Sequence, residues 1–196
     1  MGKNSMEAFS DGVIAVLITI MVLEMKVPHG ETFAALQPVL PVFMSYVLSF
    51  VYIGIYWNNH HHMLQLTESI NGVVLWANLH LLFWLSLVPF TTGWMGENHF
   101  ERGTVILYGV NLLLCAVAYT LLQTCLIRHQ GHDSALAQAV TGDVKGKAST
   151  VLYVLGIVAA WLLPVWIGMA LFVIVALIWL VPDRRIEKRI KPHPNH

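Results

Sequence analysis

The sequence predicts an all-α, polytopic membrane protein, and three observations support this fold class. Of its 196 residues, 57% are hydrophobic and only 11% are charged, whereas about 25% of the residues of a typical soluble domain are charged. The apolar residues form blocks of roughly 18–25 residues, the length that a helix needs to cross a hydrocarbon core about 30 Å thick. The connections between the blocks are short, apart from residues 128–148.

We expect six membrane helices. A hydrophobic stretch at residues 149–181 would be about 50 Å long as one helix, which is too long for a single crossing. Pro164 in its middle, followed by Gly168, favours two short helices joined at residues 163–166. The other four helices are expected at residues 8–25, 34–57, 73–95 and 103–127.

The positions of Lys and Arg support this even number of crossings. With six helices, nine of the 11 basic residues lie on the side of the N-terminus, and only Lys26 and Arg102 lie on the other side. Because cytoplasmic segments carry the excess of Lys and Arg, both termini are predicted to be cytoplasmic. We assign residues 1–182 to a six-helix transmembrane domain and residues 183–196 to a basic, disordered cytoplasmic tail.

Composition and motifs argue against several classes of function. The net charge is zero, which gives no indication of a nucleic-acid partner. Cys115 and Cys125 lie inside one apolar block, where buried thiols are unreactive. We find no Gly-rich phosphate loop, no Cys/His nucleophile pair and no paired carboxylates that would meet on one face. The sequence therefore predicts neither an enzyme nor a cofactor site.

The helix expected at residues 8–25 carries acids at both ends. Asp11 and Glu24 are separated by about 20 Å along the helix axis. An ionisable group within a membrane helix is a candidate functional residue because it is expensive to place there. The alternative is that both acids lie at the two membrane interfaces, which we favour for Glu24. Ser10 or Asp11 could also cap backbone N–H groups near the helix start.

At 100° per residue, four side chains of this helix fall on one narrow stripe: Gly12, Val16, Thr19 and Leu23. Small residues and Thr are common where membrane helices pack closely. Spacing alone therefore favours a packing face, and a pore-lining face is the alternative.

The same helix carries a recognisable motif. The segment EAFSDGVIA at residues 7–15, followed by Ile18-Thr19 and Val22-Leu23-Glu24, resembles the signature of the transmembrane protein 175 family, the endolysosomal potassium channels, in its prokaryotic branch. The resemblance is dense over residues 7–28. The segment WNNHHHM at residues 57–63 and the six-helix layout agree more loosely.

The resemblance implies a potassium-selective channel in the plasma membrane of a prokaryote, assembled as a homotetramer with the first helix of each subunit lining a central pore. It also implies the roles of the stripe. Val16 and Leu23 would form two apolar constriction rings, Thr19 would supply a hydroxyl layer tied to selectivity, and Gly12 lies on the same face. Like the family, this sequence lacks a Thr-Val-Gly-Tyr-Gly carbonyl filter.

Two departures from the family pattern concern the start of this helix. The Arg that the family carries four residues before its Phe-Ser-Asp motif is replaced by Ser5, and Lys3 is the nearest basic residue. Val16 is smaller than the Ile or Leu common at that position. Such a ring closes less tightly and would depend more on Leu23.

The chain contains ten His residues, yet we expect no metal site, because the consecutive His60, His61 and His62 cannot all face one site on a helix. We expect interfacial histidines, with some of this segment bonding the motif around Ser10 and Asp11. The predicted motif network consists of Phe9, Ser10, Asp11, Trp57, Asn58, His60 and His61.

Polar residues deeper in the chain leave a second class of function open. Asn78 and His80 are expected to make buried hydrogen bonds between helices. In the alternative function, a proton-coupled or cation secondary transporter, Asp11, Glu24 and His80 would carry the charge.

Overall fold

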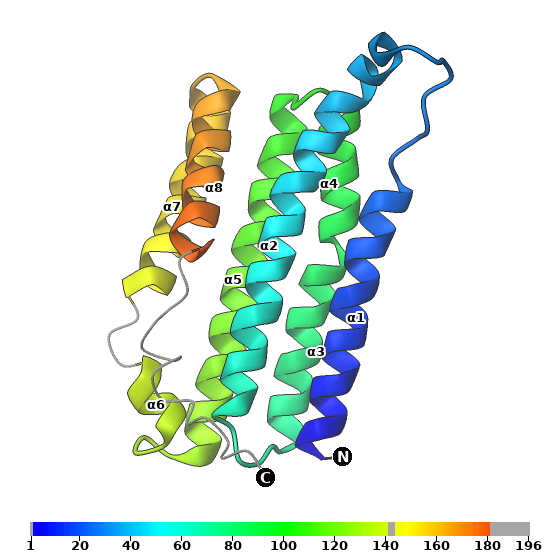
Figure 1. Ribbon diagram of the computed structural model, residues 1–196. Helices are drawn as coiled ribbons and strands as arrows, with labels where there is room; N and C mark the ends of the chain where they lie inside the picture. The colour runs from blue at the N-terminus through cyan, green and yellow to red at the C-terminus, as the bar shows by residue number, and fades with distance from the viewer. Residues whose placement is uncertain (1, 141–143, 181–196) are drawn as a thin grey trace.

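The computed structural model describes residues 2–140 and 144–180, and this part of the chain is a helical bundle without strands. Figure 1 shows an elongated bundle with α1 at one edge and the α7–α8 pair at the opposite edge. The elements, in chain order, are α1 (Lys3–Leu23), the 3-10 helix η1 (Phe33–Val39), α2 (Leu40–Gln65), α3 (Gly72–Ser86), α4 (Val88–Glu97), α5 (Arg102–Gln130), α6 (Ala135–Val140), α7 (Val144–Leu162) and α8 (Val165–Leu180).

The prediction of six apolar crossings is confirmed. Five helical segments are long and apolar enough to span a membrane, with η1 and α2 forming one of them and α3 and α4 another. The sixth is α8, a shorter apolar helix of 16 residues. The last two crossings separate at Leu163 and Pro164, as expected from the ring of Pro164, which is incompatible with a continuing helix. The predicted tail at residues 183–196 lies outside the described residues.

Several helices extend beyond the apolar blocks that reveal them. The second crossing ends at Gln65 instead of at Trp57, so the whole segment WNNHHHM is helical. The first begins at Lys3 instead of Ala8. Hydropathy marks where a helix leaves the hydrocarbon, whereas its end depends on breakers such as Gly and Pro, and residues 57–65 contain neither.

The third crossing is interrupted inside the membrane. Pro89 lacks a backbone N–H and cannot continue the hydrogen-bond ladder, so α3 ends and α4 begins around Leu87. Asn111 of α5, which is 4% exposed, covers the interruption. In the orientation that satisfies both amide atoms, its nitrogen donates to the Trp84 carbonyl (3.1 Å) and its oxygen accepts from the Val88 N–H (3.2 Å). A neighbouring helix thus supplies bonds that the broken helix cannot make for itself.

Two buried apolar clusters hold the bundle together. One lies among α1, α2, α3 and α5, and the other mainly among α2, α5, α7 and α8. Phe172 of α8, which is fully buried, packs in the second cluster against the glycines Gly109 of α5 and Gly156 of α7. Hydroxyl groups inside the bundle are paired as well: Tyr52 donates to the Phe172 carbonyl at 2.6 Å. Close approach at small residues and satisfied polar groups are what packing in a bilayer requires.

Candidate functional site

Helix α1 presents two different faces. One face packs against α2, α3 and α4 and contains every buried residue of the helix: Met6, Ser10, Ile14, Leu17 and Met21. At 100° per residue this face is roughly opposite the stripe of Gly12, Val16, Thr19 and Leu23. The packing role that spacing favoured for the stripe is therefore filled, within one subunit, by the other side of the helix.

The stripe itself is exposed along its length on the single subunit. Val16 is 52% exposed and Leu23 is 80% exposed, and the position of a Cβ at Gly12 has no neighbouring atom within 4 Å. Thr19 is also exposed, and its hydroxyl donates to the Val16 carbonyl at 2.8 Å. Because the hydroxyl proton is used inside the helix, the oxygen lone pairs remain available to a group outside it.

Behind the stripe, a chain of buried hydrogen bonds joins three helices. Ser10 Oγ donates to the Met6 carbonyl at 2.7 Å and accepts from Asn78 Nδ2 at 2.9 Å. The other end of the Asn78 amide, Oδ1, lies 2.8 Å from His60 Nε2. Ser10, Asn78 and His60 are each at most 1% exposed. The serine of the Phe-Ser-Asp motif thus ties α1 to α3 and, through Asn78, to α2.

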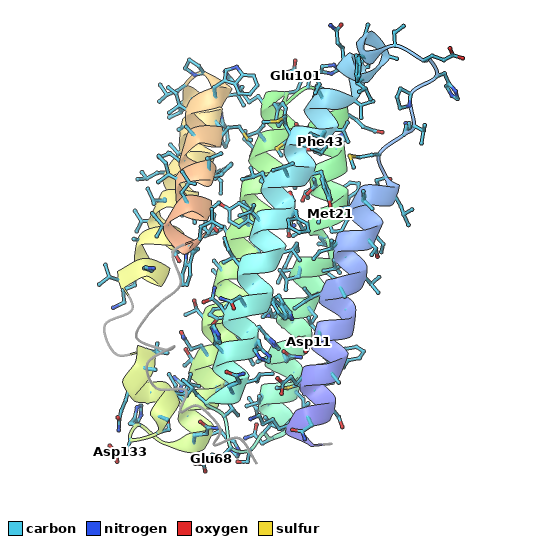
Figure 2. The ribbon with its side chains drawn as sticks, in the orientation of Figure 1. Asp11, Met21, Phe43, Glu68, Glu101 and Asp133 are labelled. Atoms are coloured by element: carbon cyan, nitrogen blue, oxygen red, sulfur yellow. The ribbon has the colours of Figure 1, made fainter. Side chains whose placement is uncertain are left out.

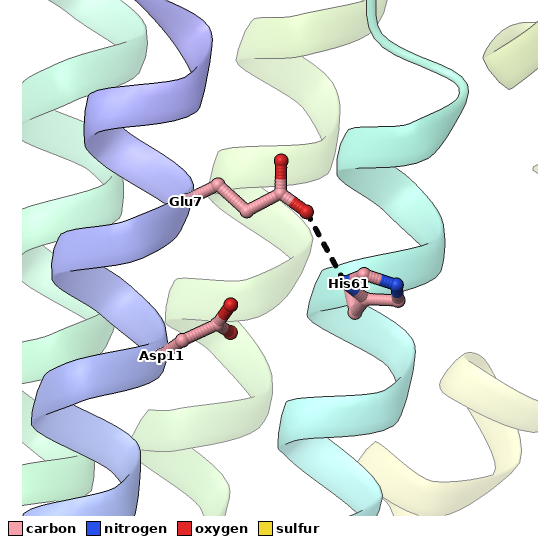
Figure 3. A group of neighbouring side chains, drawn as sticks. All are labelled: Glu7, Asp11 and His61. Atoms are coloured by element: carbon pink, nitrogen blue, oxygen red, sulfur yellow. Dashed lines mark ion pairs between the residues drawn. The ribbon is translucent and has the colours of Figure 1, made fainter.

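The aspartate of the motif makes a second connection, between α1 and α2. Trp57 Nε1 donates to Asp11 Oδ1 at 3.1 Å. Next to it, His61 Nδ1 lies 3.1 Å from Glu7 Oε1 (Figure 3), and the His61 ring stacks on Trp57 with centroids 5.9 Å apart. In Figure 2 the labelled acids Glu68, Asp133 and Glu101 lie near the two ends of the bundle, whereas Asp11 lies between these ends.

The other predicted residues take less central positions. Phe9 is 49% exposed, and Asn58 is half-buried without a side-chain hydrogen bond to the described residues. His80 departs from the expectation of a buried interhelical bond: it is exposed and accepts from Trp84 of its own helix at 2.9 Å. Its place on α3 explains this, because Asn78 faces the core and a residue two positions later points away from it.

Comparisons with known proteins identify the family. The family described as endosomal/lysosomal potassium channel TMEM175 matches residues 5–89. A protein described as a potassium channel from Chryseobacterium sp. (strain P1-3) is 52% identical over 191 residues, which cover 97% of this chain and 99% of the relative. The chain belongs to the TMEM175 family.

The fold agrees with this assignment to TMEM175. The crystal structure of a lysosomal potassium-selective channel TMEM175 homolog from Chamaesiphon minutus is similar with a TM-score of 0.80 and 25% identity, over 92% of this chain and 97% of that chain. The human protein described as endosomal/lysosomal proton channel TMEM175 is 32% identical over 96 residues, which cover 42% of this chain and 19% of the relative. The residues matched by the TMEM175 family include α1 from residue 5 onward and all of α2 and α3, the helices that carry the network described above.

Sequence reasoning missed one part of this site. It found no carboxylates sharing a face, yet Glu7 and Asp11 lie one turn apart on α1 and both face α2 (Figure 3). Their spacing of four residues was the available signal, since such residues are neighbours on a helix surface. His61 was predicted to belong to the motif network around Ser10 and Asp11, but Glu7 was not recognised as its neighbour.

Proposed function

We propose that this TMEM175 family member is a potassium-selective channel of a prokaryotic plasma membrane, which conducts as a homotetramer through a pore lined by four α1 helices. The names of its relatives support potassium conduction. The observation that carries the pore assignment is the exposed stripe on α1, whose other face is fully engaged with the bundle. A helix with one face buried in its own subunit can turn the other toward a symmetry axis.

Thr19 is the proposed selectivity layer. Its hydroxyl proton is directed to the Val16 carbonyl, so four such oxygens around an axis would present lone pairs to the pore. An ion entering a narrow apolar passage loses part of its hydration shell, and potassium gives up water at a lower cost than sodium. A ring of oxygen atoms that replaces some of that water would therefore favour potassium.

Val16 and Leu23 are the proposed constriction rings. Both side chains are exposed on the subunit, one turn before and one turn after Thr19. A ring of apolar side chains closes a pore by excluding water, without physically filling it. Leu23 is the larger of the two, so we expect its ring to carry more of the closure.

The network behind α1 has a supporting role in this proposal. Ser10, Asn78 and His60 fix the rotation of α1 about its axis, because a turned helix would leave buried polar atoms unpaired. Asp11, the next residue of α1, accepts from Trp57 and adds a second fixed point about 100° around the helix from Ser10. The orientation of the stripe thus depends on hydrogen bonds made on the opposite side of the helix. We further propose that both termini are cytoplasmic, in keeping with the distribution of Lys and Arg.

Recording from the purified protein in planar bilayers tests the proposal. We expect unitary current steps and a reversal potential that follows the potassium gradient. A secondary transporter turns over far too slowly to give unitary steps. Smooth currents too small to resolve would contradict the channel, and a reversal potential that follows the proton gradient would contradict potassium selectivity.

A further inference from the structure

Three side chains with metal-binding atoms converge between α1 and α2 (Figure 3). Glu7 and Asp11 project from α1, and His61 faces them from α2. Each offers one ligand atom, and these three atoms all lie within 4.8 Å of one another. Among the described residues, no other group of three or more His, Cys, Asp or Glu side chains comes this close.

The imidazole of His61 is held in a position suited to a ligand. Its Nδ1 lies 3.1 Å from Glu7 Oε1, yet this nitrogen is shielded from solvent and makes no hydrogen bond to the described residues. Stacking on Trp57 fixes the plane of the ring, and Gln65 Nε2 lies 2.8 Å from the other ring nitrogen, Nε2. A positioned imidazole nitrogen thus points toward carboxylates without being hydrogen-bonded to them.

The basic group that faces the two carboxylates on α1 is the imidazole of His61, which is charged only when it is protonated. Like charges four residues apart on a helix destabilise it by roughly 0.2–0.5 kcal/mol. Neither Glu7 nor Asp11 has a Lys or Arg within ion-pair distance in the described parts of the chain. Both are half-buried, which weakens the screening of their repulsion by water. A bound cation would offset this repulsion.

We propose that Glu7, Asp11 and His61 form a binding site for a divalent transition-metal ion of the Zn²⁺ type, which bridges α1 and α2 in each subunit. One imidazole nitrogen with two carboxylate oxygens is a ligand set that suits zinc better than magnesium or calcium, which prefer oxygen alone. Bonds of about 2.0–2.2 Å bring ligand atoms to within about 3.5 Å of one another, so rotation of the Glu7 and Asp11 side chains must close the widest gap.

Neighbouring side chains support the ligands. Trp57 Nε1 donates to Asp11 and orients its carboxylate. When a metal occupies Nδ1 of His61, the ring carries its proton on Nε2, and a half-turn of the Gln65 amide presents an oxygen to that proton. Three protein ligands leave a coordination position for water, which makes the site exchangeable. Metal binding at this site does not require that the protein conduct ions.

Isothermal titration calorimetry, in which ZnCl₂ is added to the metal-free, full-length protein in detergent, tests the site. The protein for this titration is prepared without a polyhistidine tag, which would itself bind Zn²⁺. We expect one high-affinity Zn²⁺ per chain, and His61→Gln and Glu7→Gln are each expected to weaken that affinity at least tenfold. His62→Gln is the matched control, because His62 is adjacent in the same histidine run but outside the cluster, and it is expected to bind like the wild type.

Three results would overturn this assignment: no high-affinity Zn²⁺ binding, a loss below about threefold in both ligand variants, or an equal loss in His62→Gln. Tighter binding of Mg²⁺ or Ca²⁺ than of Zn²⁺ would overturn the metal class. Melting curves without metal show whether each variant folds, and the near-isosteric Glu7→Gln keeps the test decisive if His61→Gln does not fold. Bilayer currents play no part in this experiment, so its failure is separate from failure of the proposed channel.

Discussion

At the scale of single residues, Thr19 is the polar side chain on an otherwise apolar stripe of α1. We expect Thr19→Ala to lower potassium-over-sodium selectivity, because the ring loses the oxygens that replace water around the ion. A loss of about 1 kcal/mol of discrimination corresponds to about a fivefold fall in the permeability ratio. Reversal potentials in mixed potassium and sodium solutions measure it. Thr19→Ser keeps the hydroxyl and is the control; an unchanged reversal potential in the Ala variant would defeat the selectivity layer.

Ser10 carries a second prediction at this scale. Ser10→Ala removes the oxygen that accepts from Asn78 Nδ2, and a buried donor left unpaired costs about 1–3 kcal/mol. We expect the melting temperature in detergent to fall by several degrees. Ser86→Ala is the matched control, since the exposed Ser86 only donates to the Phe83 carbonyl of its own helix. Equal melting temperatures for the two variants would show that the network contributes nothing to stability.

The sequence motif identified Ser10 and Asp11 as candidate functional residues, but it could not predict which side chains bond to them. Ser10 and Asp11 stood out because polar groups in an apolar helix need a reason. Asn78 was expected to bond between helices, and it does so with Ser10 and His60. Its neighbour His80 looked equivalent in sequence and lies on the opposite side of α3. Which of two nearby polar residues faces the core depends on the rotation of the helix, and an almost uniformly apolar helix gives no periodic signal that sets this rotation.

At the scale of elements, α5, α7 and α8 meet through glycines. An added Cβ at Gly109 of α5 would overlap the ring of Phe172 and approach Ile157 Cγ1 to 3.0 Å. We expect Gly109→Ala to destabilise the protein by about 1–3 kcal/mol, because the fully buried Phe172 is also packed tightly against Gly156 of α7. Thermal unfolding in detergent measures the effect.

Gly103→Ala on the same helix is the control for that prediction. A Cβ at Gly103 has no neighbouring atom within 4 Å, and alanine favours a helix over glycine by up to about 1 kcal/mol. The two variants should therefore shift the melting temperature in opposite directions. A stabilising Gly109→Ala would mean that the three helices pack less closely than described.

The existence of the helices was predictable at this scale because each crossing needs about 20 apolar residues. The residues at which the helices end were harder to predict. The second crossing runs on through the polar segment to Gln65, and the third is broken at Leu87. Pro89 lies within the apolar block at residues 73–95, and whether a membrane helix bends or breaks at proline depends on what neighbouring helices offer its freed backbone groups.

At the scale of the whole molecule, the proposed pore requires several copies of the chain, because one subunit leaves the stripe on α1 uncovered. Native mass spectrometry of the protein in detergent should give the mass of four chains of 22.0 kDa each. A monomer or a dimer as the largest species would contradict the tetramer. Assembly was open to sequence reasoning only through family resemblance, since the residues facing a symmetry axis and those facing lipid are equally apolar.

The interruption at Leu87 has a mechanical consequence for the subunit. Asn111 of α5 bonds to the last turn of α3 and to the first residue of α4. Helix α5 therefore links the two halves of the interrupted crossing. If α4 swings about this interruption, it must either carry α5 along or break the Asn111 bonds. Helix α4 also packs against α1, so a displacement of α1 that moves α4 would be transmitted through α5 to the α7–α8 pair, which packs on α5.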